Sequence, residues 1–206
     1  MRRPSHRDVL GVFVKAPLPG RVKTRLAAEV GSQRAAEIYR DLGRRAVSAA
    51  AGAGYETVVW FAPPEARPEV RAWLQGLSVA DYRAQVAGPL GTRLAAAFLR
   101  HFDEGARRVI VIGSDCPAVD ACVVTQALAS LDERDLVLGP AHDGGYYLIG
   151  LRAPASQLFH GIAWSTAAVL SQTVARARQL GLSAALLPTL RDVDTASDAR
   201  AAGVLP

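Results

Sequence analysis

Lysine is almost missing from this chain of 206 residues. Of its 24 basic residues only Lys15 and Lys23 are lysine, and both lie in the stretch KAPLPGRVKTR at residues 15–25. An ammonium is a compact point charge that fits between phosphate oxygens where a planar guanidinium does not. The placement of both lysines therefore makes residues 15–25 a candidate binding site for an anion.

Cysteine and long apolar runs are scarce as well. Cys116 and Cys122 have no metal-ligand spacing, so we expect reduced thiols in a cytoplasmic protein. Apolar runs such as Val109–Ile112 are strand-sized, far below the roughly 18 residues needed to cross a bilayer. The basic N-terminus leads into only a short apolar run without a clear cleavage site. We therefore expect no signal peptide and no membrane partner.

The net charge of +5 could suit a nucleic-acid partner, but the basic residues are scattered and aromatic residues make up only 6% of the chain. We therefore expect a phosphate-handling site and no nucleic acid.

Strand-like and helix-like stretches alternate along the whole chain. The predicted strands are residues 8–14, 57–61, 82–86, 108–112, 136–138, 146–151 and 184–187. Helices are expected between most of them, at residues 32–52, 69–77, 92–102, 122–131, 165–181 and 195–202. The order predicts an α/β fold, a three-layer sandwich with a mostly parallel mixed sheet, in one domain spanning residues 1–206. Ligands of such sheets gather at the carboxyl ends of the strands.

The basic stretch lies at the carboxyl end of the first predicted strand. Four cations fall within eleven residues there, namely Lys15, Arg21, Lys23 and Arg25. A di- or triphosphate would balance their charge, and a solvated basic loop is the alternative. A Walker A loop is excluded because Val22, and not glycine, precedes Lys23. A G-x-G-x-x-G fingerprint after the first strand is missing too.

Carboxylates follow two later predicted strands. Asp115 lies in GSDCP directly after the apolar strand at residues 108–112, and Asp192 and Asp194 alternate after the last strand. Mg²⁺ and similar ions bind through one or two carboxylates plus substrate phosphates, so these residues are candidate metal ligands. The alternative is helix capping by Asp115, by Asp194 or by Thr195.

The stretch GPAHDGGYY at residues 139–147 holds His142 and Asp143 before two glycines. A diglycine turn lets the backbone approach a ligand closely, and Asp143 could serve as a base or as an acceptor-side contact. Asp-Gly is also a common hairpin turn, so a structural role is the alternative.

Taken in order, KAPLPGRVKTRL, GSDCP, GPAHDGGYYLIGL, WST at residues 164–166 and LRDVDT resemble one family over about residues 9–200. This family is the bacterial glycosyltransferase group of the GT-A nucleotide-sugar transferase superfamily, of the radical-SAM/selenodomain-associated type. The resemblance implies a Rossmann-like GT-A sandwich. Related enzymes are 2-phospholactate guanylyltransferases and molybdenum-cofactor nucleotidyltransferases.

The resemblance also implies roles for individual residues. Asp115 and Asp194 would hold Mg²⁺ or Mn²⁺, and Lys23 and Asp143 would be catalytic. The nucleotide and its phosphates would contact Lys15, Ala16, Pro17, Gly20, Arg21, Lys23, Arg25, Gly91, Arg93 and Ser114. The acceptor side would include Gly144, Gly145, Trp164 and Ser165, the last two of which could equally be a core residue and a helix cap.

Two positions depart from the family pattern. Pro89 stands where the family usually has an acidic residue, and His142 stands where a glutamate commonly precedes Asp-Gly-Gly. The first hypothesis is glycosyl transfer from a nucleotide sugar to a small acceptor. The second is nucleotidyl transfer from a nucleoside triphosphate with release of pyrophosphate, and the third is a non-catalytic nucleotide-binding module. The sequence leaves the oligomeric state open.

Overall fold

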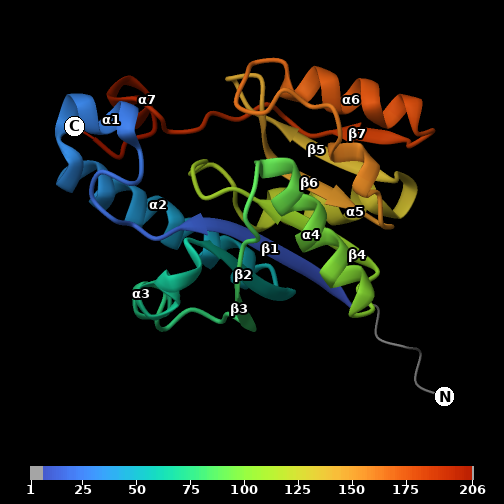
Figure 1. Ribbon diagram of the computed structural model, residues 1–206, viewed down its shortest axis with the longest axis horizontal. Helices are drawn as coiled ribbons and strands as arrows, with labels where there is room; N and C mark the ends of the chain where they lie inside the picture. The colour runs from blue at the N-terminus through green and yellow to red at the C-terminus, as the bar shows by residue number, and fades with distance from the viewer. Residues whose placement is uncertain (1–6, 206) are drawn as a thin grey trace.

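The computed structural model describes residues 7–205 and contains one mixed sheet of seven strands, ordered β3-β2-β1-β4-β6-β5-β7 (Figure 1). β6 pairs antiparallel with β4 and β5, and the other neighbouring strands pair in parallel. The fold is therefore the predicted α/β fold with a mostly parallel sheet. The strands are β1 (Asp8–Lys15), β2 (Glu56–Ala62), β3 (Asp81–Ala84), β4 (Arg108–Ile112), β5 (Leu136–Pro140), β6 (Tyr146–Leu151) and β7 (Ala184–Leu186).

Helices cover both faces of the sheet because successive strand residues point to opposite faces. On β1, Leu10, Val12 and Val14 belong to one buried cluster, while Val9 belongs to another. Residues of α2, α3 and α5 complete the first cluster, and residues of α4 and α6 the second. The helices are α1 (Thr24–Val30), α2 (Ser32–Gly52), α3 (Arg67–Trp73), α4 (Leu90–Asp103), α5 (Ala121–Glu133), α6 (Val169–Gln179) and α7 (Ala196–Ala201), with short 3₁₀ turns at Pro64–Ala66 and Ser156–Phe159.

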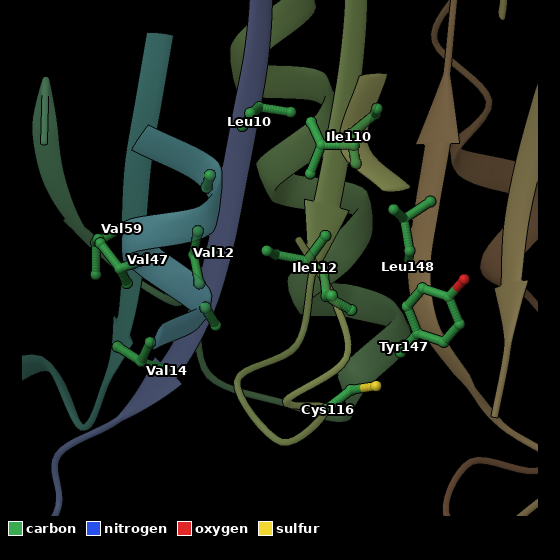
Figure 2. Packing of buried hydrophobic residues seen from close by; sticks show 14 of the residues in the cluster. Leu10, Val12, Val14, Val47, Val59, Ile110, Ile112, Cys116, Tyr147 and Leu148 are labelled. Atoms are coloured by element: carbon green, nitrogen blue, oxygen red, sulfur yellow. The ribbon is translucent and has the colours of Figure 1, made fainter. Parts of the chain in front are cut away.

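The first cluster runs along the middle of the sheet. Figure 2 shows Leu10 and Val12 of β1 beside Ile110 and Ile112 of β4, with Val47 of α2 close by. All five side chains are at most 1% exposed, so this part of the sheet is buried. Such packing fixes the positions at which β1 and β4 end.

A third buried cluster joins the first two helices to the C-terminal segment. Leu26 of α1 packs with Leu42 of α2 and with Val193 and Ala196 near the C-terminus. Figure 1 shows α7, in red, beside α1, in blue. Because α7 is anchored here, the segment before it is held against the loop that follows β1.

The strand order changes direction at β1. The chain passes from β1 to β2 and β3 on one side and then returns to β4 on the other side of β1. A crevice opens outside the carboxyl ends of strands at such a switch point, and ligands bind there. The site is therefore expected beyond Lys15 and Ile112, the last residues of β1 and β4. Within residues 7–205, no helix is long and apolar enough to cross a membrane.

Candidate functional site

A cavity of about 570 Å³ lies at this switch point. Its size is typical of small-molecule sites, which span about 300–1,000 Å³. Its walls come from the ends of β1 and β4, the start of α4 and the segment before α7. The lining residues are Phe13, Val14, Lys15, Val22, Lys23, Thr24, Arg25, Tyr39, Gln85, Gly88, Pro89, Leu90, Arg93, Gly113, Ser114, Asp115, Cys116, Tyr146, Tyr147, Ser165, Asp192 and Asp194.

The loop after β1 is folded so that Lys23 points inward. Val22 is buried and anchors the loop, and a backbone hydrogen bond of 3.0 Å from Arg21 N to Leu18 O closes a turn ahead of it. Lys23 then adopts a left-handed backbone conformation, with φ 48° and ψ 48°, at the N-cap of α1. A residue other than glycine is uncommon in this region, and such backbone strain clusters at functional sites.

The Lys23 ammonium lies between two carboxylates from distant parts of the chain. Nζ is 2.9 Å from Asp115 Oδ1 and 3.0 Å from Asp194 Oδ1, and the lysine side chain is only 4% exposed. Burial alone would lower the pKa of Lys23, but the two carboxylates outweigh it and raise the pKa. Lys23 is therefore a fixed positive charge. Arg25 forms a second ion pair with Asp194 from the solvent side.

Asp194 is held in place by the backbone on both sides of it. Val193 is fully buried, and its N–H donates to Asp115 O over 2.9 Å. Thr195 caps α7 and forms a capping box with Asp198. The capping role that the sequence left open for Thr195 is thus present, and it leaves the Asp194 carboxylate available to the cavity.

A third carboxyl group, that of Asp192, lies close to the two that contact Lys23. Burial, followed by the charges of Asp115 and Asp143, raises the pKa of Asp192 to about 7. Asp115 Oδ1 is a buried oxygen at ion-pair distance from Lys23 but without a hydrogen bond of acceptable geometry. Within residues 7–205, no three His, Cys, Asp or Glu residues are grouped to hold a metal. Carboxylates are donors that Mg²⁺ or Mn²⁺ takes together with substrate phosphates, so the chemistry of Asp115 and Asp194 is compatible with the metal role predicted for them, which stays a prediction.

A second polar group lies where β1, β2 and α4 meet. Gln85 Nε2 donates to Trp60 O at 2.9 Å, and Arg93 donates from Nε to Gly88 O at 2.8 Å and from Nη1 to Gln85 Oε1 at 3.3 Å. These contacts fix Arg93, a predicted nucleotide-binding residue, at the cavity wall. Sequence reasoning missed Gln85, because a single glutamine after a short edge strand carries no motif.

The family described as an uncharacterised protein conserved in bacteria, DUF2064, matches residues 45–166. The chain belongs to the DUF2064 family. No curated protein matches this DUF2064 protein.

Solved structures share the fold of this DUF2064 protein over nearly its whole length. A protein of Desulfovibrio desulfuricans G20, provisionally named a nucleotide-diphospho-sugar transferase, is 37% identical with a TM-score of 0.87, covering 93% of this chain and 84% of its own. A CMP:2-keto-3-deoxy-manno-octonic acid synthetase complexed with CTP is 14% identical with a TM-score of 0.57, over 97% and 100% of the two chains. The inositol-1-phosphate CTP transferase of T. maritima is 15% identical with a TM-score of 0.56, over 91% and 90%.

The structure of this DUF2064 protein brings only some of the predicted residues to the cavity. Lys15, Lys23, Arg25, Arg93 and Ser114 line it with both predicted metal ligands and Ser165. The lining does not include Ala16, Pro17, Gly20, Arg21, Gly91, Asp143, Gly144, Gly145 or Trp164. Roles for this second set stay predictions.

The Asp143 turn has the structural features of a hairpin. Asp143 Oδ1 accepts a hydrogen bond of 2.9 Å from Gly145 N, and β5 and β6 pair antiparallel on either side. Gly144 has φ +87°, and a Cβ there would lie 2.2 Å from Ala167 O. The glycine at this position is therefore required by the turn and by close backbone packing.

Cys116 is buried beneath Ile112, as Figure 2 shows. Burial, with a further contribution from Asp192, raises the pKa of its thiol to about 12. The thiolate, which is the nucleophilic form, is thus disfavoured at neutral pH. Cys116 has a packing role in the first buried cluster.

Gly91 is required for packing against Trp164. A Cβ at Gly91 would lie 2.6 Å from Trp164 Nε1 and 2.7 Å from Cζ2. We expect Gly91→Ala to lower the free energy of unfolding by about 1–3 kcal/mol, because overpacking forces side chains and backbone to shift. Urea unfolding measures this. Gly52→Ala is the control, since a Cβ there meets nothing within 4 Å, and it is expected to be neutral or stabilising. Equal stability of the two variants would contradict the packing role.

Proposed function

We propose that this DUF2064 protein is a metal-dependent transferase that uses a nucleotide-activated donor, and that it transfers a glycosyl group from a nucleotide sugar to a small acceptor. One observation carries the proposal: Lys23, Asp115 and Asp194 meet within 3.0 Å at the switch point of the sheet. A cation set beside a carboxylate pair suits a metal-bound pyrophosphate. The name of the 37% identical relative supports the same class of donor.

Each residue has a place in this reaction. A divalent ion held by Asp115 and Asp194 would supply charge stabilisation to the pyrophosphate as the bond to the leaving group breaks. Lys23 and Arg25 both touch Asp194, so they lie where phosphate oxygens would be within reach. Cations placed in advance where negative charge develops stabilise the transition state without reorganisation. Lys15 and Arg93 would orient the rest of the nucleotide.

The acceptor would enter from the side of Tyr146 and Ser165, which both line the cavity. Ser165 has φ 64° and follows Trp164. We propose Asp143 as the acceptor-side base or positioning group. Because its Oδ1 accepts from Gly145 N, the oxygen used would be Oδ2.

Nucleotidyl transfer to a phosphorylated or hydroxylated metabolite is the second candidate function. Its support is the sequence block Lys23-Thr24-Arg25-Leu26, which is similar to one in 2-phospholactate guanylyltransferases and whose two cations both lie beside Asp194. Enzymes that use CTP also have this fold. The two reactions differ in the phosphate that is attacked, and the third possibility, a non-catalytic nucleotide-binding module, lacks turnover altogether.

A ligand panel tests the proposal. We expect a nucleoside triphosphate or nucleotide sugar to raise the melting temperature with Mn²⁺ or Mg²⁺ and much less with EDTA. A ligand at a hundred times its Kd adds about 2.7 kcal/mol, which corresponds to about 5–10 °C in a chain of this size.

Product analysis then separates the candidates. Released nucleoside diphosphate indicates glycosyl transfer, released pyrophosphate indicates nucleotidyl transfer, and binding without turnover of any acceptor offered supports the non-catalytic module. If no nucleotide shifts the melting temperature with either metal, the proposal is wrong.

A further inference from the structure

A buried tyrosine connects the ends of the two strands that form the site. Tyr39 of α2 is 3% exposed and lines the cavity. Its hydroxyl accepts a hydrogen bond from Lys15 N at 2.8 Å and lies 2.9 Å from Ser114 Oγ. The contact therefore links the last residue of β1 to the loop after β4, across the switch point.

The Lys15 amide fixes the direction of its hydrogen bond with the Tyr39 hydroxyl. The Lys15 amide can only donate, so the Tyr39 oxygen is an acceptor in that contact. Within residues 7–205, Ser114 Oγ is the one acceptor that the Tyr39 hydroxyl hydrogen reaches. If Ser114 donated to Tyr39 instead, the tyrosine hydrogen would have to find its acceptor in the cavity, which Tyr39 also lines, because an unpaired buried donor costs free energy. Either oxygen could be the donor in this contact, and donation from Tyr39 to Ser114 Oγ is the direction that the proposal requires.

Tyr39 stays a donor at neutral pH. Its burial, with a further contribution from the Asp115 charge, raises the pKa of the phenol above its ordinary value. Ser114 then receives a hydrogen bond from the protein and must direct its own hydroxyl hydrogen elsewhere. Ser114 lines the cavity and immediately precedes Asp115, so an oxygen acceptor in the cavity is the partner available to it.

We propose that Tyr39 is a positioning residue that sets Ser114 as a hydrogen-bond donor to a phosphate oxygen of the bound nucleotide. This inference rests on the proposed function. It identifies the Tyr39 hydroxyl, which touches no substrate, as a determinant of phosphate binding. It also explains why a polar side chain is buried in the inner face of α2, where an apolar residue would pack without needing partners.

Inorganic pyrophosphate with Mn²⁺ is the probe, and isothermal titration calorimetry gives the Kd. We expect Tyr39→Phe and Ser114→Ala each to weaken pyrophosphate binding about tenfold, since Ser114→Ala removes the hydrogen bond to the charged phosphate and Tyr39→Phe removes the contact that orients its donor. The double variant should be no weaker than Ser114→Ala alone. A merely structural role for Tyr39 predicts additive losses instead. Thr57→Val is the control. It removes a buried hydroxyl near the start of β2, at the end of the sheet away from the site, and should bind pyrophosphate as the wild type does.

The outcomes separate the two proposals. Failure of the wild type to bind pyrophosphate with Mn²⁺ would count against the proposed function. Wild-type binding that Tyr39→Phe leaves unchanged, or additive losses in the double variant, would overturn the role of Tyr39 alone. Proton NMR of the wild type gives a second test that needs no variant. A slowly exchanging Tyr39 hydroxyl proton close to the Ser114 β protons is expected, and its absence would overturn the hydrogen-bond direction.

Discussion

Replacing Asp115 with asparagine is expected to lower transfer activity a hundredfold or more. Asparagine keeps the shape of the side chain but removes the charge that balances a divalent ion. A metal contributes several kcal/mol of charge stabilisation in such reactions, and each 1.36 kcal/mol is a factor of about ten in rate. Asp115 suits this role because its Oδ1 lacks a hydrogen bond of good geometry, its side chain is 42% exposed, and it lines the cavity.

Asp115→Asn should also weaken metal binding, which can be measured without an activity assay. Electron paramagnetic resonance of free Mn²⁺ measures binding directly, and we expect the variant to bind Mn²⁺ at least tenfold more weakly. The fold should survive, because Lys23 keeps its pair with Asp194. Asp41→Asn, an exposed aspartate of α2, is the matched control and should change neither quantity. Full Mn²⁺ affinity in Asp115→Asn would refute the metal assignment.

The strands of the fold could be predicted from the sequence because most of them are short apolar runs that end at polar, glycine or proline residues. All seven predicted strands overlap observed ones. Helix α1 was missed, since seven residues between two glycines are marginal alone, and it forms because Leu26 is buried against α2 and the C-terminal segment. Helix α6 begins at Val169 rather than at Ser165 because Ser165 has a left-handed backbone. Strand order could not be predicted from these patterns, because periodicity carries no information about neighbours.

Part of the candidate site was predictable for a similar reason. Residues at the carboxyl ends of parallel strands converge, so Lys23 and Asp115 were expected to share a cavity, and they do. Their direct contact, and the ion pair of Lys23 with Asp194 across 171 positions, were not predicted. They depend on the left-handed backbone at Lys23 and on the hydrogen bond from Val193 N to Asp115 O. Neither feature has a sequence motif of its own.

Replacing Lys23 with methionine is expected to destabilise the metal-free protein and to strengthen its binding of Mn²⁺. Methionine keeps an unbranched stem, so the backbone strain at this position changes little. Without the ammonium, Asp115 and Asp194 repel each other. Removing one partner from a buried pair costs about 3–5 kcal/mol, and because the Asp115 and Asp194 side chains are 42% and 28% exposed, we expect about 1–3 kcal/mol.

The gain in Mn²⁺ affinity follows from competition for the same oxygens. In the wild type a metal must displace the Lys23 ammonium from both carboxylates, whereas in Lys23→Met the pair is open to the ion. Urea unfolding in EDTA and in Mn²⁺ measures both effects: the variant should be the less stable protein in EDTA and should gain more from Mn²⁺. Lys15→Met is the control, because it removes the only other lysine of the chain. Lys15 lines the same cavity but pairs with no carboxylate within residues 7–205, so the free energy of unfolding of this variant should change by less than about 0.5 kcal/mol. Equal or weaker Mn²⁺ binding in Lys23→Met would mean that the ammonium and the metal do not share a position, and that Lys23 serves only to hold Asp115 and Asp194 together.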